Sequence, residues 1–138
     1  MKKLLPLFLL LFVCTLAVDA QTSLPDRGSL SEIAGKRSVY LIAEGPARPR
    51  LEKRLAKSKL FEFAQSSEAA DFFLEYLTIS RQPFGYGGTS ETGELRAYYL
   101  KSDRRVVVWS ASVTGGGFKG DTADRLCGQF LKAFSKLQ

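Results

Sequence analysis

The chain contains no histidine and only two cysteines among its 138 residues. Histidine is the most frequent general base and a common zinc ligand, and cysteine thiolates supply many of the other nucleophiles and structural zinc sites. The composition therefore argues against Ser-His-Asp and Cys-His catalysis and against the usual zinc sites. It predicts a protein that is not an enzyme and that needs no cofactor.

The first of the two cysteines lies in an N-terminal segment that we expect to be removed. Lys2 and Lys3 precede an apolar run from Leu4 to Val18, and Val18-Asp19-Ala20 places small residues at the two positions that a signal peptidase reads. Cleavage after Ala20 makes residues 1–20 a cleavable signal peptide. The mature protein is then exported, either periplasmic or secreted.

Two other fates of this segment remain open as less favoured alternatives. A retained membrane anchor needs about 20 apolar residues, whereas this run is shorter and contains Pro6. Lipoprotein processing at Cys14 is disfavoured because Val13 stands where bacterial lipidation signals usually have Gly, Ala or Ser. We expect no transmembrane segment after cleavage.

Removal of residues 1–20 leaves 118 of the 138 residues, enough for one compact domain. We expect residues 21–35 to form a flexible lead, because Pro25 and Gly28 interrupt a polar stretch, with a helical turn at 29–34 that Gly35 ends. Residues 36–138 are expected to form the single domain. Cys127 is then the only cysteine, which excludes an internal disulfide. It falls on the apolar side of the last helix, where core packing is expected, although a free thiol in an oxidising compartment also permits an intermolecular disulfide.

Positive charge is concentrated in residues 48–59, where six cations face only Glu52 and give this segment a net charge of +5. Pro46 and Pro49 suit the first turn of a helix, and Leu51 and Leu55 share one side of it. The candidate anion-binding residues on its other sides are Arg48, Arg50, Lys53, Arg54 and Lys57. The alternative is an ordinary solvated face. Nucleic acid is not an expected partner, because the segment has no aromatic residue for base stacking.

Strand and helix patterns alternate along the remainder of the chain. Strands are predicted at 38–43, 60–65, 71–81, 94–101 and 105–113, with helices at about 48–59 and 121–137, a short helical turn at 66–70 and a glycine-rich loop at 82–92. Val107, Trp109, Ala111 and Val113 are expected to share one face of the last strand. The order β-α-β-β-β-β-α predicts an α+β fold: a two-layer sandwich with a mostly antiparallel sheet of about five strands and two main helices on one face.

Two remaining patterns could carry chemistry. The carboxylates Glu62, Glu68, Asp71 and Glu75 could supply an acid and base pair for a hydrolase, but three of them alternate with apolar residues as the solvated face of strands does. Gly115, Gly117 and Gly120 spell the dinucleotide-binding pattern, yet the chain ends before the second strand and the acidic residue that such a site needs. A turn is the better interpretation.

Three segments together resemble small exported bacterial α+β domains: the strand from Val39 to Ile42 with its following helix, Ser-Ser-Glu-Ala-Ala-Asp-Phe-Phe-Leu at 66–74, and the closing helix from Phe130 to Leu137. The pattern is similar to the amino-terminal domain of TolB and to the curli-secretion and penicillin-binding-protein-activator lipoproteins. The resemblance covers residues 36–138. It implies a non-enzymatic module of the cell envelope that binds other proteins.

Our leading hypothesis is an exported accessory or protein-interaction domain whose partner is another envelope or secreted protein. A second hypothesis is binding to an anionic surface or polyanion through the basic helix at 48–59, where each cation near a charged surface adds about 1 kcal/mol. A hydrolase that uses carboxylates is the third.

Overall fold

The computed structural model of the protein describes residues 24–85, 87–116 and 121–138, with the backbone alone at 84 and 116. The expected signal peptide at 1–20, with Cys14, lies outside the described residues. So do Gly117 and Gly120 of the glycine pattern.

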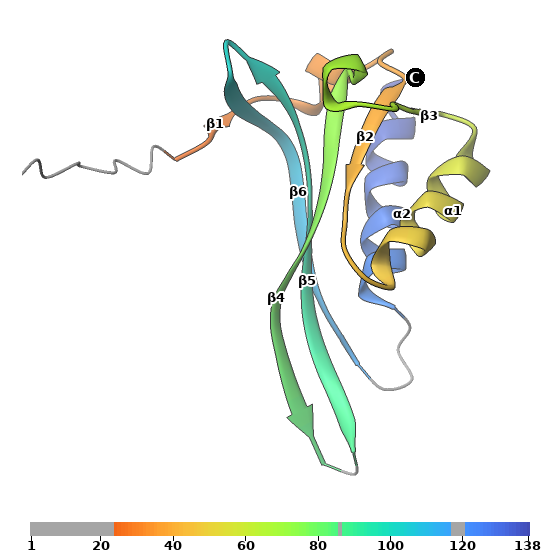
Figure 1. Ribbon diagram of the computed structural model, residues 1–138, viewed down its shortest axis with the longest axis vertical. Coiled ribbons are helices and arrows are strands. Elements are labelled where there is room, and N and C mark those ends of the chain that lie inside the picture. Colours follow the sequence, from red (N-terminus) through yellow and green to blue (C-terminus); the bar gives the residue numbers. More distant parts are fainter. Residues whose placement is uncertain (1–23, 86, 117–120) are drawn as a thin grey trace, which may run out of the picture.

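Within these described residues, six strands form one mixed sheet in the order β1-β6-β5-β4-β2-β3. The strands are β1 (Asp26–Arg27), β2 (Ser38–Ile42), β3 (Glu62–Phe63), β4 (Phe72–Phe84), β5 (Gly88–Lys101) and β6 (Arg104–Gly116). The long strands β4, β5 and β6 are antiparallel, β2 runs parallel to β3 and β4, and β1 runs parallel to β6. The helices α1 (Ala47–Ser58) and α2 (Thr122–Ser135) both cover one face of the sheet (Figure 1). The predicted α+β sandwich is confirmed.

The sixth strand comes from the segment that we expected to be a flexible lead. Asp26 and Arg27 pair with Val106 and Val107 of β6, and the 3-10 helix Leu30–Ile33 that follows buries Ile33 in the core, where its exposed fraction is 1%. Ser29 caps this helix with a capping box, and the helical turn predicted at 29–34 is confirmed. From Asp26 onward, the segment 21–35 therefore packs on the domain.

Both main helices begin and end close to their predicted bounds. α1 ends where Lys59 adopts a left-handed conformation with φ 57°, and the side chain of Asp121 caps α2 by accepting a hydrogen bond from the Ala123 amide at 2.7 Å. The core lies between the helices and the sheet. Its largest fully buried side chains are Phe72, Phe130, Phe134, Ile33, Leu51, Leu55, Leu74, Leu95, Leu126, Val39 and Cys127.

The glycine-rich segment 82–92 is mostly strand, which corrects our prediction of a loop. β4 continues to Phe84 and β5 begins at Gly88, with cross-strand pairs such as Arg81 with Glu91 and Gln82 with Ser90. Glycine and proline lower the β propensity of the segment, but each strand obtains its backbone pairing from the other. The loop is confined to the short turn between the two strands.

A bulge near the middle of β6 changes which side chains face the helices. Ala97 pairs with Trp109 and Tyr98 with Val107, so Val108 has no direct partner on β5. Val106 and Val108 are buried in the core, and Trp109 packs against it. Our prediction that Val107 shares the face of Trp109 was therefore wrong, because simple alternation does not continue through a bulge.

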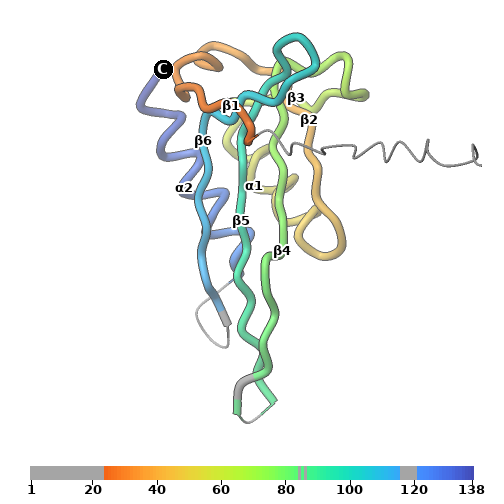
Figure 2. Tube along the Cα trace, turned by 90° about the vertical axis from the view of Figure 1, so that its left-hand side faces the viewer, coloured from red at the N-terminus to blue at the C-terminus, as the bar shows by residue number. Residues whose placement is uncertain are grey.

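The long strands reach further than the layer of helices. The β4–β5 hairpin extends beyond the ends of both helices, as the two perpendicular views show (Figures 1 and 2). We call its distal part, residues 79–85 and 87–92, the arm.

Candidate functional site

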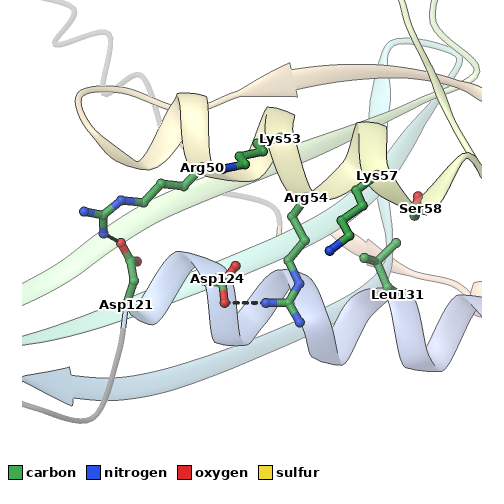
Figure 3. A pocket seen from close by; sticks show the side chains of 8 residues that line it. All are labelled: Arg50, Lys53, Arg54, Lys57, Ser58, Asp121, Asp124 and Leu131. Atoms are coloured by element: carbon green, nitrogen blue, oxygen red, sulfur yellow. Dashed lines mark hydrogen bonds and ion pairs between the residues drawn. The ribbon is translucent and has the colours of Figure 1, made fainter.

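The predicted basic helix forms ion pairs with α2 that the sequence order did not reveal. Arg50 pairs with Asp121 and Arg54 with Asp124, both across the two helices (Figure 3). Arg48 pairs with Glu52 within α1 at 2.9 Å. Three of the five candidate anion-binding residues therefore already have carboxylate partners, and the local positive charge is lower than the composition of α1 indicates.

A shallow groove of about 740 Å³ follows the seam between the helices (Figure 3). Four of the five candidate residues line it, together with Ser58, Asp121, Asp124 and Leu131; these four are Arg50, Lys53, Arg54 and Lys57. Arg48 lies elsewhere, beside a smaller hollow near β3. The structure thus brings four of the predicted cations together and separates the fifth.

Lys53 and Lys57 differ from the two arginines of the groove. Within residues 24–85, 87–116 and 121–138, no carboxylate lies within ion-pair distance of either lysine. Arg54 lies directly over Gly128 of α2, where an added Cβ would stand 2.7 Å from its Nη2 atom. The groove therefore holds two arginines that are paired with carboxylates and two exposed lysines that are not.

Cys127 is fully buried beneath this seam, on the apolar side of α2. Burial raises the pKa of its thiol to about 11, although the nearby Arg54 guanidinium acts in the opposite direction. A thiol of this kind is protonated at neutral pH and inaccessible. Cys127 is therefore a core residue, as expected.

The four candidate carboxylates lie on separate elements and contact different partners. Asp71 accepts hydrogen bonds from the amides of Ser38 at 3.0 Å and Arg37 at 3.3 Å, which fixes the start of β2. Glu75 lies 3.7 Å from Arg105, and Glu62 is exposed on β3. Glu68 lies on the 3-10 helix Ser67–Ala69, where hydrogen bonds from its own backbone and from serines lower its pKa. Among the described residues, no group of three or more acidic or cysteine side chains is arranged to hold a metal ion.

A polar cluster that the sequence did not predict lies at the base of the arm. Glu91 of β5 accepts hydrogen bonds from the Tyr76 hydroxyl at 2.7 Å and from the Thr122 hydroxyl at 3.3 Å, and it pairs with Arg81 at 2.9 Å. These contacts join β4, β5 and the first turn of α2. The bond from Tyr76 and the charge of Arg81 lower the pKa of Glu91. Burial contributes most to the raised pKa of the Tyr76 hydroxyl, and its hydrogen bond to Glu91 raises that pKa further.

The cluster lines a polar hollow of about 200 Å³ that Arg50 and Asp121 also border. The only sequence signal for it was the alternation of Thr89, Glu91 and Gly93, which is typical of a strand with one polar face. We missed it because the surrounding glycines predicted a loop. Gly115 also borders the hollow; it lies within β6 and pairs with Glu91 of β5. The first glycine of the dinucleotide-like pattern is therefore in a strand.

The arm beyond this cluster buries none of its described side chains. Its backbone is paired in register from Ser80 with Thr92 to Phe84 with Gly88. Ile79, at the point where the register shifts, has an exposed fraction of 56%. The base of the arm still pairs with β6, from Thr92 with Thr114 to Ser90 with Gly116, and the tip beyond it is a two-stranded ribbon whose described side chains are at least partly exposed.

No protein-family model matches this chain, and no curated protein matches it in sequence. Solved bacterial structures are similar to it in fold. The hypothetical protein CT253 from Chlamydia trachomatis has 7% identity and a TM-score of 0.44, over 73% of this chain and 94% of that one. A PelC dodecamer from Paraburkholderia phytofirmans has 16% identity and a TM-score of 0.46, over 75% and 89%. A minor lipoprotein from Acinetobacter baumannii has 11% identity and a TM-score of 0.46, over 73% of this chain and 92% of that one.

At these identities and scores, the similarity says nothing about function. No family model supports the specific likeness to TolB and the curli-secretion proteins. In the described part of the chain, neither helix has the length and apolar character needed to span a bilayer.

Proposed function

We propose that this protein is an exported, non-catalytic module that binds another envelope or secreted protein through its arm. One observation carries the proposal: the described side chains of the arm are all at least partly exposed, and beyond the pair of Ser90 with Gly116 its two strands have no third strand beside them in the described part of the chain. An isolated two-stranded hairpin is only marginally stable in water. A partner that packs on the arm would bury this surface and supply the missing stabilisation.

The base of the arm favours the same use. The contacts of Glu91 with Tyr76, Arg81 and Thr122 tie the ribbon to the first turn of α2. An arm held in one orientation loses less conformational freedom on binding than a mobile loop does, and this loss is a large cost of association. The cluster therefore makes the arm a preorganised contact surface.

The open face of the sheet is less suited to this role. Its aromatic side chains already cover one another: Phe73 and Tyr98 stack with ring centroids 5.0 Å apart, and Arg105 lies 4.9 Å above the Tyr98 ring. Phe73 and Tyr98 retain exposed fractions of only 6% and 3%. Little apolar surface remains there for a partner, whereas Ile79 at the start of the arm is largely exposed.

The proposal is tested with a variant whose arm is shortened. Replacing residues 82–90 with Asn-Gly closes the hairpin at the existing pair of Arg81 and Glu91 with a turn that suits two-residue connections. Native and shortened chains, both checked for the same far-ultraviolet spectrum, are used as bait in an envelope extract. We expect the native chain to retain a protein that the shortened chain loses. Equal capture by both, or none by either, would overturn the proposal.

Binding to an anionic surface remains a second candidate, and one observation favours it. Lys53 and Lys57 lie on one groove, and their ammonium groups have no carboxylate partner in the described part of the chain. The carboxylates of Asp121 and Asp124 in the same groove oppose an anion, which is why we rank this candidate second.

A further inference from the structure

The unequal lengths of the strands leave two backbone edges without a neighbour. β4 and β6 have 13 residues each, whereas β2 has 5 and β1 has 2. Pairing with β2 ends at Glu75 on β4, and pairing with β1 ends at Val107 on β6, where the Gly28 amide donates to the Val107 carbonyl at 2.9 Å. Beyond these points, no described strand pairs with the outer edge of either strand.

The two edges differ in their protection against pairing with another strand. The edge of β4 from 76 to 84 carries Arg81, Pro83 and a register shift between Thr78 and Ser80, all features by which sheet proteins block an exposed edge. The edge of β6 from 109 to 115 reads Trp-Ser-Ala-Ser-Val-Thr-Gly and contains neither a charge nor a proline. This edge, here called the β6 edge, is open to a further strand.

The chain itself does not fill the β6 edge in the described structure. β1 runs parallel to β6 and leaves it at Gly28, before the β6 edge begins, and the chain then enters the 3-10 helix Leu30–Ile33. Among the described residues, the only side chain that donates a hydrogen bond to a β6 carbonyl is that of exposed Arg125, whose Nη1 donates to Thr114 at 3.4 Å. A backbone amide of an added strand could replace this long bond.

We propose that the β6 edge pairs with the same edge of a second copy of this chain, antiparallel and centred on Ser112. On the open face, Ser112 then lies opposite Ser112, and Ser110 opposite Thr114; all three are exposed in the single chain. On the helix face, Ala111 lies opposite Val113, and Trp109 opposite Gly115. No pair brings together two charges or two large side chains.

The chain already contains the same kinds of cross-strand pair. The hydroxyls of Thr92 and Thr114 bond at 2.8 Å across β5 and β6, as Ser110 and Thr114 would across the two copies. On a diagonal of the β4–β5 pair, the ring of Tyr76 covers Gly93, where an added Cβ would stand 2.9 Å from the ring carbon Cζ. A charged partner strand would find no opposite charge along the β6 edge, whereas a second copy places small or polar side chains opposite one another and Trp109 opposite a glycine.

A cysteine placed at the centre of the pairing tests the proposal directly. Directly opposed residues of antiparallel strands have Cβ atoms about 4.5–5.5 Å apart, close to the range that a disulfide bridges. Under mild oxidation, we expect Ser112→Cys to give a disulfide-linked dimer on a non-reducing gel. The matched control is Ser80→Cys, an equally exposed serine on the protected edge of β4, which should stay monomeric. The buried Cys127 takes no part.

Charged substitutions at Ser112 test the register without a covalent bond. In sedimentation equilibrium, we expect the native chain to show a concentration-dependent dimer, and Ser112→Lys and Ser112→Glu each to be monomers because like charges would face each other. Mixing the two variants should restore a dimer. Equal cross-linking of the two cysteine variants, or a native chain that stays monomeric while the mixture does not associate, would overturn the pairing.

This inference goes beyond the proposed function and uses a different surface. The chain with the shortened arm keeps all of the β6 edge, so it should still form the Ser112→Cys dimer. Variants at Ser112 that abolish the dimer should keep partner binding by the arm. The chain with the shortened arm should lose partner binding and keep the dimer.

Discussion

At the scale of single residues, Glu91 determines how the arm joins the domain. Its carboxylate accepts hydrogen bonds from two hydroxyls and pairs with Arg81, and these contacts connect three elements. The hydrogen bond from Tyr76 contributes most to its lowered pKa. A carboxylate with a lowered pKa stabilises the folded state in its charged form.

The stability of the fold should therefore depend on pH through Glu91. Because its pKa is lower in the folded state, its contribution is fully present above the ordinary glutamate range and is lost as the pH falls through the folded pKa. We expect Glu91→Gln to destabilise the protein at pH 7 and to have a smaller effect in acid. Urea unfolding of both chains at several pH values measures this difference. A difference that does not change with pH would contradict it.

Gly93 provides space for the ring that covers it. A Cβ at this position would lie 2.9 Å from Cε2 and Cζ of Tyr76, whose hydroxyl is held by Glu91, so the ring cannot move without breaking that bond. We expect Gly93→Ala to lower the free energy of unfolding by about 1–3 kcal/mol. The control is Gly85→Ala, where an added Cβ meets nothing within 4 Å, and denaturant unfolding should show little change.

At the scale of elements, periodicity predicted what packs on one face. The apolar steps of α2 and the N-cap at Asp121 were confirmed, because a helix that buries one stripe shows that stripe in its sequence. The arm was not predicted, because its strands bury no described side chain and so have no apolar alternation. The bulge at Val108 was equally invisible, since pairing between strands decides it.

The turn between β5 and β6 is one element that a substitution should improve. Ser102 and Asp103 have φ angles of 49° and 62°, a left-handed conformation at both central positions. Such turns favour Asn-Gly, because other residues pay about 1–2 kcal/mol for this conformation. We expect the double change Ser102→Asn and Asp103→Gly to raise the free energy of unfolding by about 1 kcal/mol, as measured by thermal unfolding. A lower melting temperature would contradict this expectation.

α1 allows a separate test of the second candidate function. If the groove binds anionic surfaces, changing Lys53 and Lys57 to Gln should weaken binding to anionic vesicles on the order of tenfold, with the loss greatest at low salt. The control removes the same charge elsewhere, with Arg48→Gln and Lys101→Gln, because neither residue lines the groove. Equal losses from the two double variants would show that only net charge matters, and no loss from either would remove the candidate.

At the scale of the whole molecule, the sequence predicted the fold class better than it predicted the surfaces. Four of the five cations did gather on one groove, since helical spacing places them there. The carboxylate partners of Arg50 and Arg54, however, lie some 70 residues away in sequence, at Asp121 and Asp124. Likewise, Glu91 meets Thr122 only because the sheet brings the arm to the start of α2. Contacts of this range depend on the assembled fold.

Export is a property of the whole chain, and it has a direct readout. If residues 1–20 are a signal peptide, the protein recovered from outside the cytoplasm should begin at Gln21, and its intact mass should fall by that of the first 20 residues. A mature chain that keeps Met1 would contradict export by cleavage. One that begins at Cys14 would indicate lipidation.

Contact between the arm and a partner can be measured by site-specific photo-cross-linking in the living cell. A photoreactive residue at Gln82, exposed on the arm, is compared with one at Lys101, equally exposed at the opposite end of the same sheet. We expect the photoreactive residue at Gln82 to give a discrete adduct with another envelope or secreted protein, and the one at Lys101 to give none. No adduct from position 82, or the same adduct from both positions, would contradict it.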